Sequence, residues 1–178
     1  MAEYLNTGVF VTENDQHHRE YLKRQSSGTL HLQHCEDCRL FIYPVRTMCP
    51  DCSGSNLQWK PLSGKGTIYS YYIVPHPIHP AFRGQTPYPV ALIELDEQRG
   101  VGSELGDRTL QPNEFRAIRM IGNIVREDGS WEDRDHIAIG KRVEVYMIDL
   151  GDGWALPQWR LSDEPAQGDN WQIPRPHE

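Results

Sequence analysis

The chain has 178 residues, 38% of them hydrophobic, and a formal net charge of −7. This length supports one modest core, or a small core with a metal-stabilised module, and the negative charge argues against nucleic-acid binding by the chain as a whole. No apolar run approaches the length of a membrane span, and 15 glycines with 13 prolines favour strands and turns over a helical bundle.

The first predicted element is a short helix from Glu13 to about Gln25. Thr12 and Asp15 match a capping box, in which a hydroxyl side chain caps the helix and an acidic residue follows three positions later. Tyr21 and Leu22 are its few apolar residues, so this helix gains little free energy from burial. We therefore expect a solvated N-terminal appendage, with a partner-docking helix as the alternative.

The four cysteines of the chain form two CxxC pairs, Cys35 with Cys38 and Cys49 with Cys52. Two such pairs, each in a tight turn, bring four sulfurs around one point, which suits a tetrahedral Zn²⁺ ion. Because four thiolates fill the coordination sphere, this zinc would be structural and would leave no position open for water or substrate. The alternatives are an iron site of rubredoxin type, a redox CxxC pair and a disulfide framework.

The disulfide alternative depends on the compartment. Residues 1–10 lack the basic region and the apolar run of a signal peptide. We therefore expect a cytoplasmic protein whose cysteines stay reduced.

The segments around the two cysteine pairs predict three short strands, at residues 29–34, 41–43 and 56–62. The order strand, knuckle, strand, knuckle, strand is that of a zinc ribbon. Its few apolar residues cannot hold it folded without the metal. The expected core of the ribbon consists of Leu32, Phe41, Tyr43 and Trp59.

From Gly64 onward the chain is rich in β-branched and aromatic residues, and five strands are predicted. Gly122 interrupts the third strand and suggests a bulge or a tight bend, and Pro157 places the fifth strand at an edge or a bulge. Five strands with a longer connection before the fourth suit a small Greek-key barrel of the OB type. The predicted strands span residues 67–74, 90–95, 117–125, 142–150 and 154–161.

Three segments lie outside these strands. Residues 75–89 carry five prolines, so we expect a stiff, extended loop that projects from the barrel. Residues 98–115 are polar, as are residues 162–178, which have one aromatic anchor in Trp171.

The complete order is helix, four-cysteine ribbon, glycine-containing join and five-strand barrel. Several motifs accompany this order: CEDC at 35–38, YPVRTMCPDC at 43–52, LQW at 57–59, SGKGTIYS at 63–70, PYPVALIELD at 87–96, IGKRVEV at 139–145 and LP at 156–157. On these motifs, from about residue 13 to residue 160, the chain resembles the zinc-ribbon plus OB-fold family of acyl-CoA-associated proteins, long catalogued as a domain of unknown function.

The resemblance implies a mainly β protein with an N-terminal helix, a rubredoxin-like zinc ribbon and a five-stranded OB-fold barrel. We accordingly divide the chain into an N-terminal segment (1–28), the ribbon (29–62), the barrel (63–161) and a C-terminal tail (162–178). Residues 99–115 look like an insertion between barrel strands two and three.

The resemblance also implies a function. Family members are small, usually non-catalytic subunits of thiolase-superfamily complexes, including thiolases, acyltransferases and the aldolases that shorten steroid side chains. We therefore expect an accessory zinc-binding subunit of an α2β2 complex with a thiolase-like enzyme of lipid or steroid metabolism. That enzyme would make or break a carbon–carbon bond next to a CoA thioester, with acyl-CoA as a ligand of the complex.

No catalytic residue is assigned, because the cysteines are engaged and no histidine accompanies an evident nucleophile. His76, His79, Phe82 and Arg83, in the proline-rich loop, are the candidate partner or CoA interface. Rigid prolines lower the ordering cost of docking, and Phe and Arg are frequent at interface hot spots. Lys65 is a candidate contact for the CoA phosphates.

The alternative function is a single-stranded nucleic-acid-binding module, since zinc ribbons and OB folds both serve in that role. Tyr69, Tyr71 and Tyr72 would then form a stacking platform. The net charge of −7 and the lack of a basic stripe argue against it. An independent enzyme or an acyl-CoA carrier is a third possibility.

Overall fold

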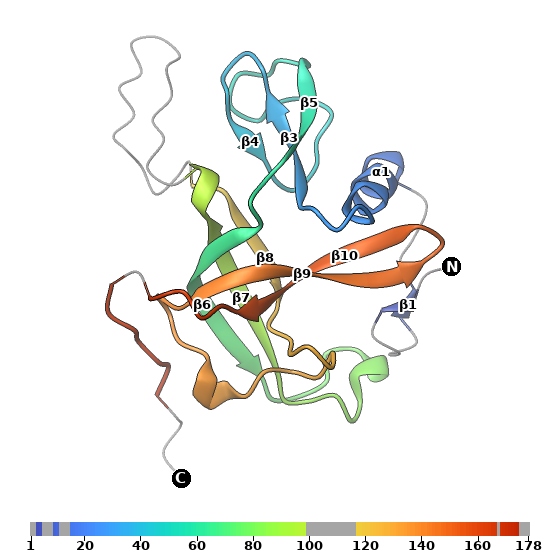
Figure 1. Cartoon of the computed structure of the whole chain (residues 1–178). Coiled ribbons are helices and arrows are strands. Elements are labelled where there is room, and N and C mark those ends of the chain that lie inside the picture. Colours follow the sequence, from blue (N-terminus) through green and yellow to red (C-terminus); the bar gives the residue numbers. More distant parts are fainter. Residues whose placement is uncertain (1–2, 5–8, 11–14, 99–116, 167, 175–178) are drawn as a thin grey trace.

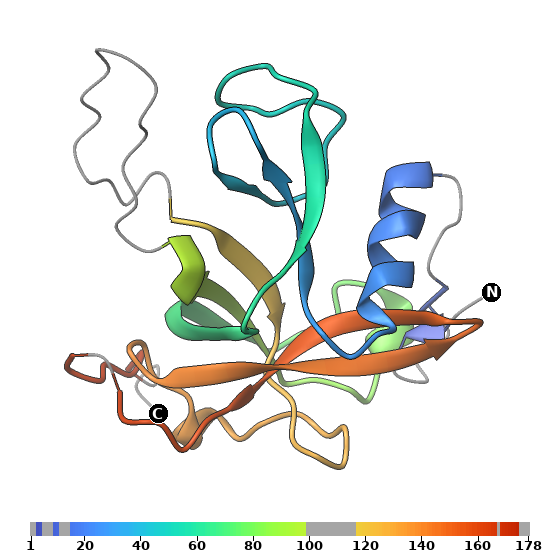
Figure 2. The same ribbon diagram turned by 45° about the horizontal axis from the view of Figure 1, so that its top comes forward.

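The computed structural model describes residues 3–4, 9–10, 15–98, 117–166 and 168–174. A small sheet that carries the cysteines lies above a barrel, and one helix stands beside both (Figures 1 and 2). The helix is α1 (Gln16–Gln25), and the strands are β1 (Glu3–Tyr4), β2 (Val9–Phe10), β3 (His31–Cys35), β4 (Phe41–Ile42), β5 (Leu57–Pro61), β6 (Lys65–Val74), β7 (Tyr88–Leu95), β8 (Arg119–Asn123), β9 (Arg142–Gly151) and β10 (Trp154–Leu161). The expected order of helix, ribbon and barrel is confirmed.

The barrel is a five-stranded antiparallel sheet in the order β10-β9-β6-β7-β8. A parallel bridge between Ile124 and Trp159 joins its two ends, where the Val125 N–H donates to the Trp159 carbonyl at 2.8 Å. This bridge closes the sheet, as the predicted OB barrel requires. The interior is apolar because alternate side chains of each strand point inward, and its fully buried members include Ile68, Ile93, Met120 and Trp159.

Of the bulge or tight bend predicted at Gly122, the bulge is wrong. The β7–β8 register runs without a shift through the pair Ala91–Gly122. A Cβ on Gly122 would lie 2.7 Å from the Trp159 ring, so glycine is present because the indole packs directly on the backbone. The described register shift of the first barrel strand lies instead between Ile68 and Ser70 in β6. Pro157 lies on β10, an end strand of the sheet order, as predicted.

The N-terminal helix begins later than predicted and is not an appendage. Asp15 is the N-cap, and its carboxylate accepts hydrogen bonds from the His17 and His18 N–H groups at 2.8 and 3.2 Å, whereas Thr12 lies outside the described residues. Helix α1 packs against β10, and Tyr21 and Leu22 are buried in the main core. The long β9–β10 hairpin supplies an apolar surface that no property of the helix itself predicts.

The ribbon sheet has the order β4-β3-β5, as expected for a zinc ribbon. Leu32 is fully buried, but in the same cluster as the barrel core, and Phe41, Tyr43 and Trp59 pack against that cluster. The prediction that these residues form a separate ribbon core is therefore wrong. Their side chains pack the ribbon against the helix and the barrel. The separate cluster around the cysteines uses other residues, namely Leu40, Ile42 and Leu57.

The described part of the C-terminal tail lies along the barrel. The backbone of Trp171 pairs with Ile139, and the Ile173 N–H donates to the Tyr71 hydroxyl at 2.8 Å. The ring of Trp171 is 52% exposed, so the anchor lies in the backbone and not in the indole. The predicted insertion at 99–115 falls outside the described residues.

Candidate metal centre and neighbouring surfaces

Two equivalent turns hold the four cysteines. In the first, the Arg39 N–H donates to the Cys35 carbonyl at 2.8 Å, and in the second the Ser53 N–H donates to the Cys49 carbonyl at 2.9 Å. Arg39 and Ser53 both have a positive φ, 57° and 62°, which turns the chain back after the second cysteine of each pair. Each CxxC pair therefore presents its two sulfurs from one compact knuckle.

Gly54 follows the second knuckle at a position where a side chain does not fit. A Cβ there would lie 2.4 Å from the Asp37 carboxylate and 3.2 Å from the Cys52 sulfur. The Gly54 N–H also donates to the Cys52 sulfur at 3.4 Å. The sequence analysis did not single out this glycine, although its place two residues after a CxxC pair is a usable signal.

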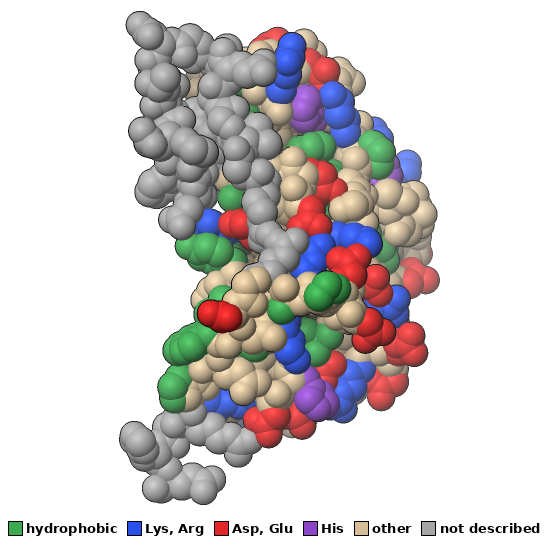
Figure 3. Space-filling view, turned by 60° about the vertical axis from the view of Figure 1, so that its left-hand side comes forward, with side chains coloured by type: hydrophobic (Ala, Val, Ile, Leu, Met, Phe, Trp, Pro, Cys, Tyr) green, Lys and Arg blue, Asp and Glu red, His purple; other side chains and the backbone are tan. Residues whose placement is uncertain are grey.

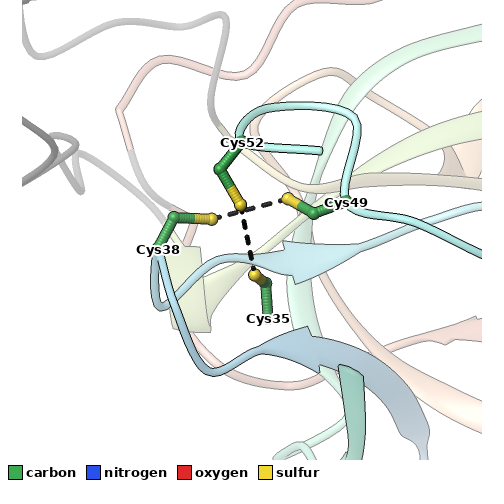
Figure 4. A group of neighbouring side chains, drawn as sticks. All are labelled: Cys35, Cys38, Cys49 and Cys52. Atoms are coloured by element: carbon green, nitrogen blue, oxygen red, sulfur yellow. Dashed lines mark hydrogen bonds between the residues drawn. The ribbon is translucent and has the colours of Figure 1, made fainter. Parts of the chain in front are cut away.

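The four sulfurs converge on one point (Figure 4) and lie within 4.8 Å of one another. The Cys35–Cys52 and Cys38–Cys49 sulfurs are 3.6 and 3.5 Å apart. A disulfide bond measures about 2.05 Å, so all four cysteines are free. Zinc–sulfur bonds of about 2.3 Å in a tetrahedron place neighbouring sulfurs about 3.8 Å apart. Both the donor set and the spacing fit a four-thiolate metal site.

The site is largely closed to solvent. Cys35, Cys38 and Cys49 are buried, and Cys52 is partly exposed. Burial, followed by the neighbouring Cys49 sulfur, raises the pKa of the Cys38 thiol. Metal binding must displace that proton, so affinity for the metal is expected to fall in acid.

Two buried glutamines stabilise the ribbon: Gln33 within it and Gln98 from the barrel segment. Gln98, at the end of the barrel segment, accepts the Phe41 N–H through Oε1 at 2.6 Å. Gln33 accepts the Arg46 N–H at 2.7 Å and donates to the Arg46 carbonyl at 3.0 Å. Both side chains are buried. Sequence reasoning missed Gln98, because nothing local indicates which distant backbone group a buried amide will bind.

The proline-rich loop is not extended throughout as predicted, although residues 75–80 are exposed. A 3-10 turn at Pro80–Phe82 is capped by His79, whose Nδ1 accepts the Ala81 N–H at 3.2 Å. The Phe82 ring lies 5.3 Å from the Tyr88 ring. Of the four loop residues proposed for an interface, His79 and Phe82 thus shape the loop; His76, His79 and Arg83 are exposed and Phe82 is half-buried.

Lys65 belongs to an ion-pair network and not to a free basic patch. Lys65 pairs with Glu164, and this carboxylate raises the pKa of Lys65. In turn, Lys65 and Arg142 lower the pKa of Glu164. The Arg142 guanidinium, 4% exposed, also donates to Asp96 at 2.7 Å and to Thr67 at 2.9 Å. A CoA phosphate at Lys65 would have to compete with Glu164. On the described part of the face in Figure 3, basic and acidic side chains alternate, with hydrophobic ones along its left-hand rim.

Two family models match adjoining parts of the chain. Residues 26–58 match the rubredoxin-like zinc ribbon domain of ChsH2, and residues 59–147 match its C-terminal OB-fold domain. Among the described residues, no helix is long and apolar enough to cross a membrane.

Two curated proteins are also similar to parts of this chain. A "DUF35 domain-containing scaffold protein" of Pyrococcus furiosus is 33% identical over 96 residues, which are 52% of this chain and 68% of that protein. A "Probable enoyl-CoA hydratase alpha subunit" of Thermomonospora curvata is 40% identical over 66 residues, 37% of this chain but only 20% of the relative's length.

A solved structure resembles the chain over both modules. It is described as "Ltp2-ChsH2(DUF35) aldolase", and the match has a TM-score of 0.62 and 25% identity, covering 85% of this chain and 98% of that one. The resemblance therefore includes the ribbon, the barrel and their order. The chain belongs to the ChsH2 zinc-ribbon and OB-fold family, whose members include the DUF35 scaffold proteins.

Proposed function

We propose that this protein is an accessory, non-catalytic subunit of a thiolase-superfamily enzyme that acts on acyl-CoA thioesters. The observation that carries the proposal is the likeness to the ChsH2 chain of an aldolase complex, which covers nearly the whole of that chain. The scaffold proteins and the hydratase subunit among the relatives support a role in assembly. The large subunit would carry out thiolysis, acyl transfer or retro-aldol cleavage.

Within that assembly the metal site has a structural role. Cys35, Cys38, Cys49 and Cys52 would hold Zn²⁺, and the ion would supply a cross-link between the two knuckles. Since four thiolates complete a tetrahedral shell, no ligand position is left for a substrate. The four cysteines therefore preserve the shape of the ribbon, and the bond-making groups would come from the partner.

The stoichiometry and the CoA contacts belong to the same proposal. Thiolase-type enzymes are usually dimers, so we propose an α2β2 complex in the cytoplasm. His76 and Arg83 are exposed on the loop and would contact the partner or CoA, with His79 and Phe82 keeping the loop in shape. Lys65 would approach the CoA phosphates from the edge of the ion-pair network.

Reconstitution tests the proposal. A candidate thiolase-like protein of the same organism is purified with and without the chain, and acyl-CoA turnover and size-exclusion elution with light scattering are measured. We expect co-elution as two copies of each chain, and activity that depends on the accessory chain. Separate elution with unchanged activity would refute the proposal. A salt-sensitive, micromolar affinity for single-stranded DNA would favour the nucleic-acid alternative instead.

A further inference from the structure

The outer face of three barrel strands exposes a group of apolar side chains. Among the described residues, Tyr69 is 41% exposed, Tyr72 60% and Ile121 59%, which makes them half of the six large hydrophobic side chains that are exposed. They come from β6 and β8, on either side of β7 in the sheet. Their gathering on one face distinguishes them from apolar residues scattered singly over a surface.

The strand register makes this face continuous. Ser70 pairs with Leu92, which pairs with Ile121, so Leu92 and Ile121 lie directly opposite each other. Tyr72 pairs in the same way with Val90. Directly paired residues share a face of a sheet, and Val90 and Leu92 are both partly exposed. We call this surface the outer sheet face; its members are Tyr69, Tyr72, Val90, Leu92 and Ile121.

The charges on the outer sheet face are already compensated. Glu94 and Arg119 lie opposite each other on β7 and β8 and form an ion pair at 2.9 Å, with side chains 14% and 20% exposed. The Arg119 guanidinium also lies 3.6 Å from the centre of the Tyr69 ring. The Asn123 amide donates to the Pro89 carbonyl at 2.8 Å. Burying this face under a partner therefore leaves no unpaired charge. An unpaired buried charge would be the main free-energy cost of such burial.

This charge balance determines which ligand fits. A polyanion such as single-stranded DNA needs unpaired cations, and the Arg119 charge is matched by Glu94. The stacking platform predicted from the three tyrosines is also incomplete: Tyr71 is buried inside the barrel, and Arg119 covers the ring of Tyr69. An uncharged, apolar protein surface satisfies the same residues without leaving a charge unpaired.

We propose that the outer sheet face is the surface on which this chain docks its enzyme subunit, an inference that rests on the function proposed above. The occupant is an apolar surface of the thiolase-type protein. Tyr72 and Ile121, the most exposed members, lie on either side of β7 and act as anchors, because large buried side chains carry most of the affinity of an interface. The proline-rich loop begins at Pro75, three residues after Tyr72, and extends the contact at its margin.

The test measures binding of the full, metal-loaded chain to the candidate thiolase-type protein used in the reconstitution. Ile121→Glu and Tyr72→Glu each place an unpaired charge within the proposed contact, and we expect the Kd to rise by at least about tenfold for each. Met48→Glu is the matched control, since Met48 is 55% exposed but lies on the ribbon. Metal content and thermal unfolding of every variant establish that each is folded.

The outcomes separate the two proposals. If the wild-type chain does not bind the enzyme subunit, the proposed function fails. If the wild-type chain and both sheet variants bind with equal affinity, or if only Met48→Glu weakens binding, the outer sheet face is not the docking surface and the proposed function stands. Self-association of the free chain that both sheet variants abolish would identify a second copy as the occupant, and would also overturn the inference.

Discussion

The ribbon and the barrel reach a folded state by different means. The barrel closes a five-stranded sheet around fully buried side chains such as Ile68, Ile93 and Trp159. The cysteine end of the ribbon has a small cluster of which three buried members are cysteines. Hydrophobic burial is enough to organise the barrel, whereas the knuckles need a metal to define their geometry.

The two regions are nevertheless not independent. Leu32 of the ribbon and Leu22 of the helix share one buried cluster with the barrel core. We expect the cysteine end to depend on metal, while the opposite end of the same sheet packs against the barrel. One end of the ribbon is therefore expected to be stabilised by metal binding and the other by hydrophobic packing on the barrel. Three experiments test how far each kind of stabilisation extends.

Metal removal is expected to have the largest effect. Apparent binding free energies for structural zinc in small peptides are about 10–16 kcal/mol near neutral pH, so chelation or Cys38→Ser should unfold the two knuckles. Hydrogen exchange should show lost amide protection near Cys35 and Cys49, with protection kept in the barrel strands β6 and β7.

The control for metal removal is Met48→Ala, which changes an exposed side chain next to Cys49. It should retain one equivalent of metal and normal protection. Amide protection at the knuckles that survives complete removal of the metal would show that the packing of Leu40 and Ile42 is sufficient, and the contrast between ribbon and barrel would fail.

Truncation of the helix anchor comes next in size. Leu22 is fully buried in the shared cluster, and large-to-small changes at such sites cost about 2–5 kcal/mol of unfolding free energy. Leu22→Ala should lower stability by that amount in urea denaturation, and Lys23→Ala, on the exposed side of the same helix turn, should change it little. Equal, small effects of both substitutions would restore the interpretation of the helix as a solvated appendage.

The smallest effect is expected at Gln98, whose side chain joins the barrel segment to the ribbon. Gln98→Ala removes the acceptor of the Phe41 N–H, and leaving such a group unsatisfied costs about 1–3 kcal/mol. Gln98→Met keeps the volume but not the hydrogen bond, so both variants should lose similar stability in urea denaturation. If Gln98→Met were as stable as wild type, the glutamine would matter for its volume and not for joining ribbon to barrel.

The comparison also explains which predictions from the sequence succeeded. The convergence of the four cysteines and the positions of the barrel strands could be predicted because their signals are local: two CxxC pairs and runs of β-branched and aromatic residues. β10 spans Trp154–Leu161, as predicted. The start of α1 was misplaced because two residue types suited to an N-cap lie three positions apart, and the capping geometry at Asp15 decides between them.

Other features depend on contacts between distant parts of the chain. Gly122 looks like a strand interruption, but its lack of a side chain accommodates Trp159, 37 positions later. In the sequence, Phe41 and Trp59 look like the core of a separate ribbon, but they pack against the main hydrophobic cluster of the barrel. Lys65 looks like a free cation until Glu164 is placed beside it.

The sequence by itself determined the grouping of the four cysteines, the order of modules and most of the barrel strands, because spacing and periodicity are properties of a local stretch of chain. Only the tertiary structure decided that the helix is buried, that the ribbon shares the barrel core, and that the outer sheet face is apolar with its charges paired. Those properties arise when strands far apart in the sequence become neighbours, and then burial and charge compensation depend on the partner of each residue and not on its type.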